Sequence, residues 1–206
     1  MKKLILHLCA DTGSDTKPYQ DDPDYEVVCI GSKIGVENYH APKNVYAVFA
    51  NPPCTHFSSV RTKAKTPRDI NEGLRLVFEC QRIIKEANPK FWVIENPATG
   101  LLKKYLGTPA FVYQPWEFGS PWSKKTALWG NFNKPEKIYK TWESVPSKIA
   151  SLYIRPGRDK PNMVYLHKNA KRNIREFDVF DDVGSDMEFR SLCSQKFAKA
   201  FKEVNP

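Results

Sequence analysis

Long apolar runs are missing from this sequence. No run approaches the roughly 20 consecutive apolar residues that a membrane-spanning helix needs. The apolar stretch that follows Met1 ends at Asp11, and it is too short for a signal peptide and has no small-residue cleavage site. The sequence therefore predicts a cytoplasmic protein with no membrane association.

Cysteine is sparse and odd in number. The chain has five cysteines, a count that argues against a framework of disulfides. Close pairs of Cys and His occur only at His7-Leu8-Cys9 and Cys54-Thr55-His56, and neither pair has the spacing of a zinc site. We expect neither disulfides nor a structural metal.

Acidic side chains are outnumbered by basic ones. The chain has 23 Asp and Glu against 32 Lys and Arg, and the formal net charge of +9 suits a polyanionic partner such as DNA. One segment holds a single acid, Asp159, among seven basic residues, namely Arg155, Arg158, Lys160, Lys168, Lys171, Arg172 and Arg175. This segment is interpreted either as a DNA-contacting loop or as solvated surface.

Short apolar runs alternate with helical patterns through the first two-thirds of the chain. Strands are predicted at residues 4–8, 25–30, 46–50, 91–94 and 126–129. The clearest helical pattern covers residues 67–87, with Thr66 as its cap. Such alternation predicts an α/β fold with a mostly parallel sheet, helices on both faces and ligands at the carboxyl ends of the strands.

The length of 206 residues fits a single domain. Residues 131–185 are polar, basic and interrupted by prolines, so they are predicted to form an irregular basic insert with a hairpin around residues 163–166. Apolar residues recur at helical spacing near the carboxyl terminus, which predicts an amphipathic helix within residues 186–206.

Two chemical motifs stand at the ends of predicted strands. Pro52-Pro53-Cys54 places a thiol on a stiff turn, and Glu95-Asn96-Pro97 places a carboxyl group after the next strand. A thiolate that adds to carbon-6 of cytosine makes carbon-5 nucleophilic, and an acid at N3 stabilises the adduct. Cys54 and Glu95 are therefore candidate catalytic residues. A small buried hydrophobe and a helix cap are the structural alternatives for the two side chains.

The order of these motifs resembles that of the cytosine-5 DNA methyltransferases, and short phage-encoded members are the closest likeness. Residues 8–14 resemble the family's first motif, residues 51–54 its nucleophile motif, and residues 95–97 its Glu-Asn-Val motif with Pro in third place. Residues 119–126 resemble a later segment that leads into a strand. The resemblance implies a Rossmann-like enzyme that transfers a methyl group from S-adenosylmethionine to carbon-5 of cytosine in DNA.

The same resemblance implies which residues act. Cys54 would be the nucleophile and Glu95 the partner of cytosine N3. The residues implied for the cofactor are Leu8, Cys9, Ala10, Asp11, Thr12, Gly13, Ser14, Asn51 and Pro52. Those implied for DNA are Lys124, Lys125 and the seven basic residues of the 155–175 segment. The terminal helix would pack back on the core and complete a single methyltransferase-like domain.

The chain also departs from the family pattern. His7 stands where the first motif has an acid, and Asp11 replaces the first glycine of the cofactor loop. Little of the chain is left for a target-recognition domain, which implies that a partner subunit supplies sequence specificity.

Two alternatives stay open. Asn51-Pro52-Pro53 also fits amino-methyltransferases that act on a base, although Cys54 stands where those enzymes have an aromatic residue. The altered cofactor loop would suit a non-catalytic DNA-binding or accessory protein on a decayed methyltransferase scaffold. A covalent adduct with 5-fluorocytosine DNA tests the first alternative, and a titration with S-adenosylmethionine tests the second.

Overall fold

The computed structural model describes the chain except for residues 11, 60, 62–64, 147, 181 and 182. The chain divides into two compact units. The first unit comprises residues 1–112 and 126–132, and the second comprises residues 113–125 and 133–206. That the whole chain acts as one methyltransferase-like domain stays a prediction.

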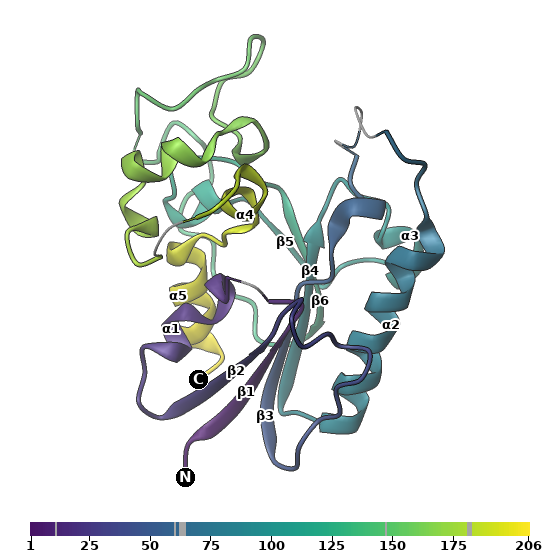
Figure 1. Ribbon diagram of the computed structural model, residues 1–206. Helices are drawn as coiled ribbons and strands as arrows, with labels where there is room; N and C mark the ends of the chain where they lie inside the picture. Colours follow the sequence, from purple (N-terminus) through teal and green to yellow (C-terminus); the bar gives the residue numbers. More distant parts are fainter. Residues whose placement is uncertain (11, 60, 62–64, 147, 181–182) are drawn as a thin grey trace. The chain divides into compact units, whose positions relative to one another are not determined.

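A six-stranded sheet, with strand order β2-β1-β3-β4-β6-β5, is built mainly from the first unit (Figure 1). The pairs β1–β2, β1–β3 and β3–β4 are parallel, whereas β4–β6 is antiparallel. The strands are β1 (Lys3–Leu8), β2 (Tyr25–Ile30), β3 (Val45–Ala50), β4 (Phe91–Pro97), β5 (Phe111–Tyr113) and β6 (Thr126–Asn131). The five predicted strands are confirmed, and β5 is an additional short strand.

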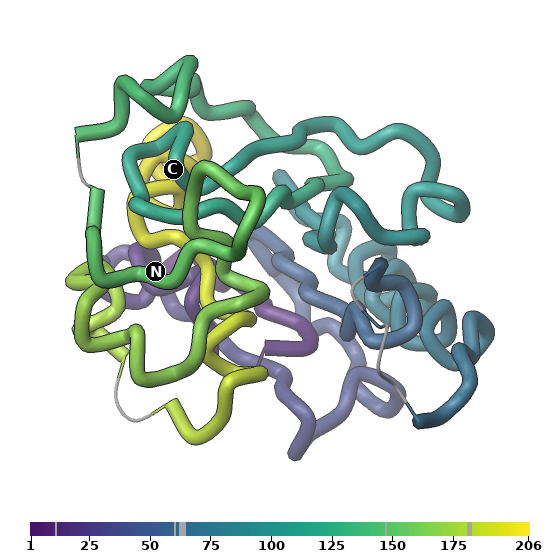
Figure 2. The backbone as a smooth tube through the Cα atoms, turned by 90° about the horizontal axis from the view of Figure 1, so that it is seen from above, coloured from purple at the N-terminus to yellow at the C-terminus, as the bar shows by residue number. Residues whose placement is uncertain are grey.

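The strand order reverses at β1. The chain passes from β1 to β2 on one side and then crosses to β3 on the other side of β1. Ligands of open α/β sheets bind outside the carboxyl ends of the strands at such a reversal. β1 and β3 run upward in Figure 1, and Figure 2 looks down on the side where they end.

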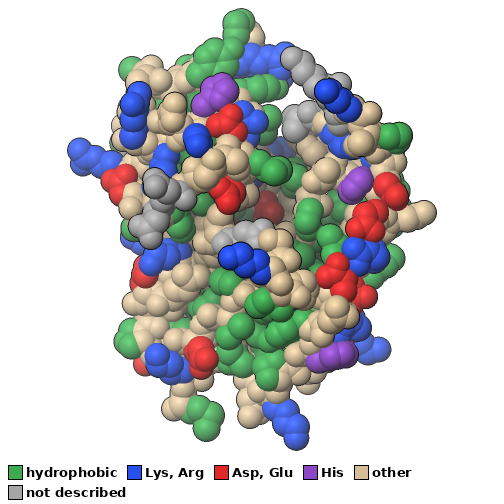
Figure 3. Space-filling view, viewed as in Figure 1, with side chains coloured by type: hydrophobic (Ala, Val, Ile, Leu, Met, Phe, Trp, Pro, Cys, Tyr) green, Lys and Arg blue, Asp and Glu red, His purple; other side chains and the backbone are tan. Residues whose placement is uncertain are grey.

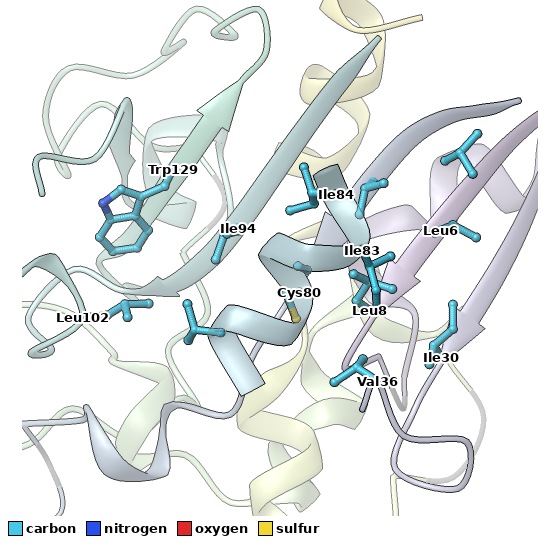
Figure 4. Packing of buried hydrophobic residues seen from close by; sticks show 14 of the residues in the cluster. Leu6, Leu8, Ile30, Val36, Cys80, Ile83, Ile84, Ile94, Leu102 and Trp129 are labelled. Atoms are coloured by element: carbon cyan, nitrogen blue, oxygen red, sulfur yellow. The ribbon is translucent and has the colours of Figure 1, made fainter. Parts of the chain in front are cut away.

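One face of the sheet packs on α2 (Ile70–Ala87). Alternate strand residues point toward this helix, and Figure 4 shows Leu8 beside Ile83. Each fully buried Leu or Ile contributes about 1.5–3 kcal/mol, so this cluster is a major source of stability. Its fully or nearly buried strand members are Leu6, Leu8, Ile30, Val45, Val48, Ala50, Ile94, Ala127 and Trp129.

The opposite face of the sheet packs on α1 (Lys17–Gln20). Tyr19 of this short helix meets Phe49 with ring centroids 5.6 Å apart and Tyr25 at 5.1 Å. Helices therefore lie on both faces of a mostly parallel sheet. This arrangement confirms the predicted α/β, Rossmann-like fold class.

The amino terminus of α2 differs from the prediction. The helix is capped by Asp69, whose carboxylate accepts a hydrogen bond from the Glu72 backbone N–H at 3.0 Å. Thr66, the predicted cap, instead accepts a hydrogen bond from Arg61 at 2.8 Å. The helix therefore begins at Ile70, three residues after the predicted start at Pro67.

The outer face of α2 is covered by ion pairs. Arg75 bonds to Glu72 and Glu37 at 2.8 and 2.9 Å, and Arg82 bonds to Glu79 and Glu86, both at 2.7 Å. Figure 3 shows acidic and basic side chains interleaved at the right of the view. The helix is thus amphipathic, with one apolar stripe on the sheet and a solvated face.

The second unit is built from short helical turns. They are η3 (Pro115–Phe118), η4 (Met163–Tyr165), η5 (Lys168–Asn173) and η6 (Arg175–Phe177), followed by α4 (Asp186–Ser191) and α5 (Gln195–Val204). The 3-10 turn η4 replaces the hairpin predicted there, so that prediction was wrong. The carboxyl-terminal segment holds two helices rather than one, because the Ser194 hydroxyl caps a new helix by accepting from the Phe197 N–H at 3.1 Å.

The second unit has its own apolar cluster, with Trp122, Phe177 and Phe189 fully buried. None of the helices in the described part of the chain is long and apolar enough to span a membrane.

A single carboxylate organises the amino terminus of α5. Glu176 Oε2 accepts hydrogen bonds from the Ser120 hydroxyl at 3.0 Å and from the Gln195 N–H at 2.9 Å. Its Oε1 accepts from Trp122 Nε1 at 3.1 Å. A carboxylate at a helix amino terminus is favoured by the helix dipole. Glu176 thus ties the segment around Ser120 and Trp122 to the last helix.

We predict that Glu176→Gln lowers the free energy of unfolding by about 2 to 3 kcal/mol. The substitution removes the negative charge and places an NH2 group, itself a donor, against groups that donate to the carboxylate. Chemical denaturation followed by circular dichroism measures the change. Glu203→Gln, an exposed change on α5, should stay near the wild type. An equal effect of the two substitutions would show that the carboxylate of Glu176 has no special role.

Candidate active site

Cys54 begins a tight turn directly after β3. The backbone of Asn51 donates to Leu8 O at 3.0 Å, so the sheet pattern continues one residue beyond the strand. Pro53 then enters the 3-10 turn η2 (Cys54–His56) with φ −51° and ψ 125°. The Cys54 carbonyl accepts from the Phe57 and Ser58 N–H groups at 2.9 and 2.7 Å. The thiol is therefore carried on a fixed backbone and is partly exposed.

Arg68 holds this turn from outside. Its guanidinium donates to the carbonyl oxygens of His56 and Ser58. His56 Nδ1 accepts from the Asp69 N–H at 2.9 Å, which joins the turn to the start of α2. Hydrogen bonds therefore join the Cys54 turn to the start of α2.

The Cys54 turn is also joined to the segment that follows β4. Asn96 Nδ2 donates to Pro52 O at 2.9 Å, and the Asn96 side chain is buried. Farther along, the Leu101 N–H donates to Phe57 O at 2.9 Å. The Ser59 hydroxyl adds a third link at 3.1 Å, to Thr99. Three hydrogen bonds thus connect the segment that bears Cys54 with the segment that follows Glu95.

Strand register places the predicted site residues at one edge. Leu8, Ala50 and Ile94 lie in register across the three adjacent parallel strands β1, β3 and β4. The next residues along these strands are Cys9, Asn51 and Glu95, so all three stand at the same level of the carboxyl edge. Glu95 is half-buried there.

A buried histidine links β1 to the loops that follow β1 and β3. His7 Nδ1 lies 2.9 Å from the Thr16 hydroxyl and His7 Nε2 lies 3.1 Å from Asn51 Oδ1. Asn51 Nδ2 in turn donates to the Asp15 carboxylate at 2.9 Å. Since Asn51 Oδ1 only accepts, His7 carries a proton on Nε2 and donates it to Asn51. His7 therefore orients Asn51, three residues before Cys54.

Burial lowers the pKa of His7, and the nearby charge of Asp15 and the hydrogen bond to Asn51 oppose the shift only in part. The imidazole is 1% exposed, so a positive charge there would lose its hydration. His7 is therefore neutral in the folded protein at neutral pH.

The predicted cofactor loop follows β1. Gly13 has φ +63°, the left-handed region that favours glycine, and a Cβ there would lie 2.7 Å from Gln20 Nε2. Cys9 also has a positive φ, of 54°, and its sulfur lies 3.8 Å from that of Cys80. The hydrogen bond with Cys9, together with burial, raises the pKa of Cys80. Asp11 lies outside the described residues.

Of the predicted cofactor residues, Leu8, Ala10 and Ser14 are buried, and Thr12 is half-buried. Pro52 is buried, and its carbonyl oxygen accepts a hydrogen bond from the side-chain amide of Asn96. Asn51 bonds to β1 through Leu8 O and to the Asp15 carboxylate at once. Asp15, Thr16, Arg68 and Asn96 were not predicted from the sequence, because only their hydrogen bonds across the fold show what they do.

The predicted DNA-contacting residues differ in how they are placed. Lys168 Nζ donates to Gly184 O at 3.0 Å and Lys171 Nζ to Phe180 O, so both stabilise their own loop. Lys124 Nζ lies 3.4 Å from Ser191 O. The exposed members are Lys125, Arg155, Arg158, Lys168, Arg172 and Arg175. Among the described residues, no group of three or more His, Cys, Asp and Glu side chains is placed to hold a metal ion.

Residues 30–110 match the model of the family described as C-5 cytosine-specific DNA methylase. Cys54 and Glu95 both lie within the match, and so do all three hydrogen bonds that link their segments. This part of the chain is therefore similar to C-5 cytosine-specific DNA methylases. The first strand, the predicted cofactor loop and the second unit lie outside the match.

One curated relative is a frog virus 3 protein described as a probable DNA (cytosine-5)-methyltransferase. It is 33% identical over 104 residues, which cover 43% of this chain and 47% of the relative. The chain thus spans about half the length of that relative. A solved structure from an Escherichia coli prophage, assigned as a DNA modification methyltransferase, has 14% identity and a TM-score of 0.39, covering 62% of this chain and 45% of its own.

The neutral state of His7 predicts a pH dependence of stability. The unfolded chain binds a proton at the ordinary His pKa of 6.5, whereas the folded protein resists it. Stability should therefore fall as the pH drops below about 6.5, by up to about 1.4 kcal/mol at pH ~5.5. Denaturation of wild type and His7→Gln at about pH 7.5 and 5.5 isolates this contribution, because Gln keeps a donor and an acceptor but does not titrate. Equal pH dependence in both proteins would contradict the neutral His7.

The close packing at Gly73 of α2 leads to a second prediction, on stability and on the Cys54 turn. A Cβ at this position would lie 2.8 Å from Phe57 Cζ and 3.0 Å from His56 Cβ, and Phe57 is fully buried. Alanine gains about 1 kcal/mol of helix propensity, but overpacking costs about 1–3 kcal/mol. We expect Gly73→Ala to destabilise the protein and to displace the Cys54 turn. Thermal melts measure the first effect and adduct formation with 5-fluorocytosine DNA the second.

The matched control is Asn71→Ala, an exposed substitution in the first turn of α2, two residues before Gly73. It gains helix propensity without a steric clash. If Gly73→Ala proved as stable and as reactive as Asn71→Ala, the tight contact under the nucleophile turn would be refuted.

Proposed function

We propose that this protein transfers a methyl group from S-adenosylmethionine to carbon-5 of cytosine in DNA through a covalent adduct with Cys54. The observation that carries the proposal is the set of hydrogen bonds that joins the Cys54 turn to the segment after Glu95, led by Asn96 to Pro52 at 2.9 Å. These links join the segments that carry a thiol and a carboxyl group, within the part of the chain that matches the C-5 cytosine-specific DNA methylase model.

Cys54 supplies the nucleophile. Its thiolate adds to carbon-6 of the cytosine ring, and the electrons of the 5,6 double bond then make carbon-5 reactive. Pro53 and the two hydrogen bonds to the Cys54 carbonyl fix the approach of the sulfur. After methylation, carbon-5 loses its proton and the bond between sulfur and carbon-6 breaks, which restores the aromatic ring and the thiolate.

Glu95 supplies the acid. A carboxyl group at N3 gives a proton or a hydrogen bond to the ring as negative charge develops there during the addition. The half-buried position after an apolar strand keeps the carboxyl group partly out of water. Proton transfer in such a setting is more effective than in bulk solvent.

The residues after β1 and β3 suit S-adenosylmethionine, which would supply the methyl group. They stand where the strand order reverses, the usual ligand position in open α/β sheets. Gly13 makes a close left-handed turn there. The Asp15 side chain is 14% exposed and is held by Asn51, so a carboxylate is available for the positive charge of the cofactor.

The second unit would bind the DNA backbone. Its exposed cations, among them Arg158, Arg172 and Arg175, can each neutralise a phosphate. A cytosine within a duplex has to leave the stack before a thiol can reach carbon-6. A partner subunit would supply recognition of a particular sequence.

A trapping experiment tests the proposal. Fluorine at carbon-5 cannot leave as a proton does, so a 5-fluorocytosine oligonucleotide should remain bound to Cys54 through denaturation in the presence of S-adenosylmethionine. Denaturing gel electrophoresis and mass spectrometry detect the adduct. Cys54→Ser should abolish it, and Glu95→Gln should slow it by about 100-fold or more, as loss of an acid does.

Cys193→Ser is the matched control, because Cys193 is buried in the second unit and outside the candidate site. It should trap DNA like the wild type per folded molecule. An adduct that persists in Cys54→Ser would overturn the mechanism. Methyl transfer without any adduct would favour an amino-methyltransferase, and no binding of S-adenosylmethionine in calorimetry would favour an accessory protein.

A further inference from the structure

The second unit carries an exposed loop in which apolar and basic side chains stand together. Tyr153 and Ile154 are 54% and 44% exposed, although isoleucine is among the residues most often buried. Arg155 and Arg158 follow and are exposed. Figure 3 shows hydrophobic and basic side chains gathered at the top of the view, over the green loop of Figure 1. Residues 153–158 are called the finger below.

The end of the finger is a stiff turn. The Arg158 N–H donates to Arg155 O at 3.0 Å, and Gly157 has φ +79°. Pro in the second place and a left-handed Gly in the third are typical of a type II turn. The turn fixes two arginines at its ends and leaves Tyr153 and Ile154 directly before it.

The base of the finger is anchored on both sides. Leu152 is 4% exposed and belongs to the apolar cluster of the second unit. Pro161 O accepts from the backbone N–H and the hydroxyl of Ser123, both at 2.9 Å. Lys160 Nζ lies 5.8 Å from the Trp116 ring and 5.7 Å from the Trp142 ring. The apolar exposure is thus confined to the part between two fixed ends.

The arginine at the start of the turn is held in place as well. Arg155 lies over the Tyr165 ring at 4.9 Å and donates to its hydroxyl at 2.6 Å. Asp159, the acid nearest the turn, pairs with Lys160 at 2.6 Å. The finger therefore presents positive charge beside its exposed apolar side chains, and this combination suits a nucleic acid better than an apolar protein surface.

We propose that the finger contacts DNA bases that have left the stack. The Tyr153 ring stacks on an exposed base, Ile154 packs against the opened step, and Arg158 binds a flanking phosphate. An aromatic ring stacks on any base, and an aliphatic side chain inserted at a step keeps it open. The inference rests on the proposed function, because an enzyme that modifies a base has to unstack it.

The test compares two short duplexes, one fully paired and one with a single mismatched cytosine beside a 2-aminopurine reporter. The wild type should prefer the mismatched duplex and raise the 2-aminopurine fluorescence, which reports unstacking. Tyr153→Ala should weaken binding to that duplex by roughly 5- to 150-fold. It should leave the salt dependence of binding unchanged, because no charge is lost.

Arg158→Ala should act differently. It should reduce the slope of log affinity against log salt by about 0.9 and weaken both duplexes alike, and Arg158→Lys should restore the slope. Ile138→Ala is the matched apolar control, because Ile138 is 64% exposed in the same unit but outside the finger. It should bind both duplexes like the wild type.

Three results would overturn the inference. The first is an unchanged preference for the mismatched duplex in Tyr153→Ala. The second is a loss of self-association in that variant, measured by ultracentrifugation. The third is that the protein binds anionic lipid vesicles through the finger but does not bind DNA. The trapping experiment gives an independent outcome. An adduct on Cys54 with an inert finger would refute only this inference, whereas a finger that binds unstacked DNA without any adduct would refute only the proposed chemistry.

Discussion

The hydrogen bond from Asn96 Nδ2 to Pro52 O is the interaction on which the candidate site depends most. The parallel ladder between β3 and β4 ends at Ala50 and Ile94, so backbone pairing does not hold the chain beyond that level. A buried amide then takes over and fixes the spacing between the two segments. Such a hydrogen bond has a net worth of about 1 kcal/mol, but its loss would cost more, because it would also leave a buried carbonyl unsatisfied. The two segments would then be joined only by the hydrogen bonds from Leu101 to Phe57 and from Ser59 to Thr99.

The neighbouring contacts follow from the same constraint. His7 and Asn51 fix the near side of the nucleophile turn through β1, and Arg68 fixes the far side through the backbone of the turn. Gly73 lets α2 approach the turn closely. The backbone that carries Cys54 is thus restrained from three directions, and such preorganisation suits the role that we propose for its thiol.

The sheet could be predicted from the sequence because its central strands are short β-branched and aromatic runs, and Cys54 and Glu95 could be placed because each follows such a run. The cap of α2 could not be predicted, because the choice between Thr66 and Asp69 was decided by Arg61 and His56 across the fold. The role of His7 was hidden for the same reason, since its partners lie nine and 44 residues away. Local patterns carry no information on such contacts.

In the second unit, a count of basic residues does not show how each of them is used. Lys168 and Lys171 were grouped with the arginines around them, yet both donate to carbonyl oxygens of their own loop. An ammonium group bonds a carbonyl as readily as a phosphate, so only the fold distinguishes the two uses. The break between α4 and α5 is similar, because the apolar spacing continues through residues 192–194 while the Ser194 cap starts a new helix.

The most direct measurement is a crystal structure of the protein covalently trapped on a 5-fluorocytosine oligonucleotide. We predict a bond between Cys54 Sγ and carbon-6 of the base, the Glu95 carboxyl group within hydrogen-bond distance of N3, and the Asn96 to Pro52 hydrogen bond intact. A bond from another cysteine, or a Glu95 side chain that faces away from the trapped ring, would contradict this prediction.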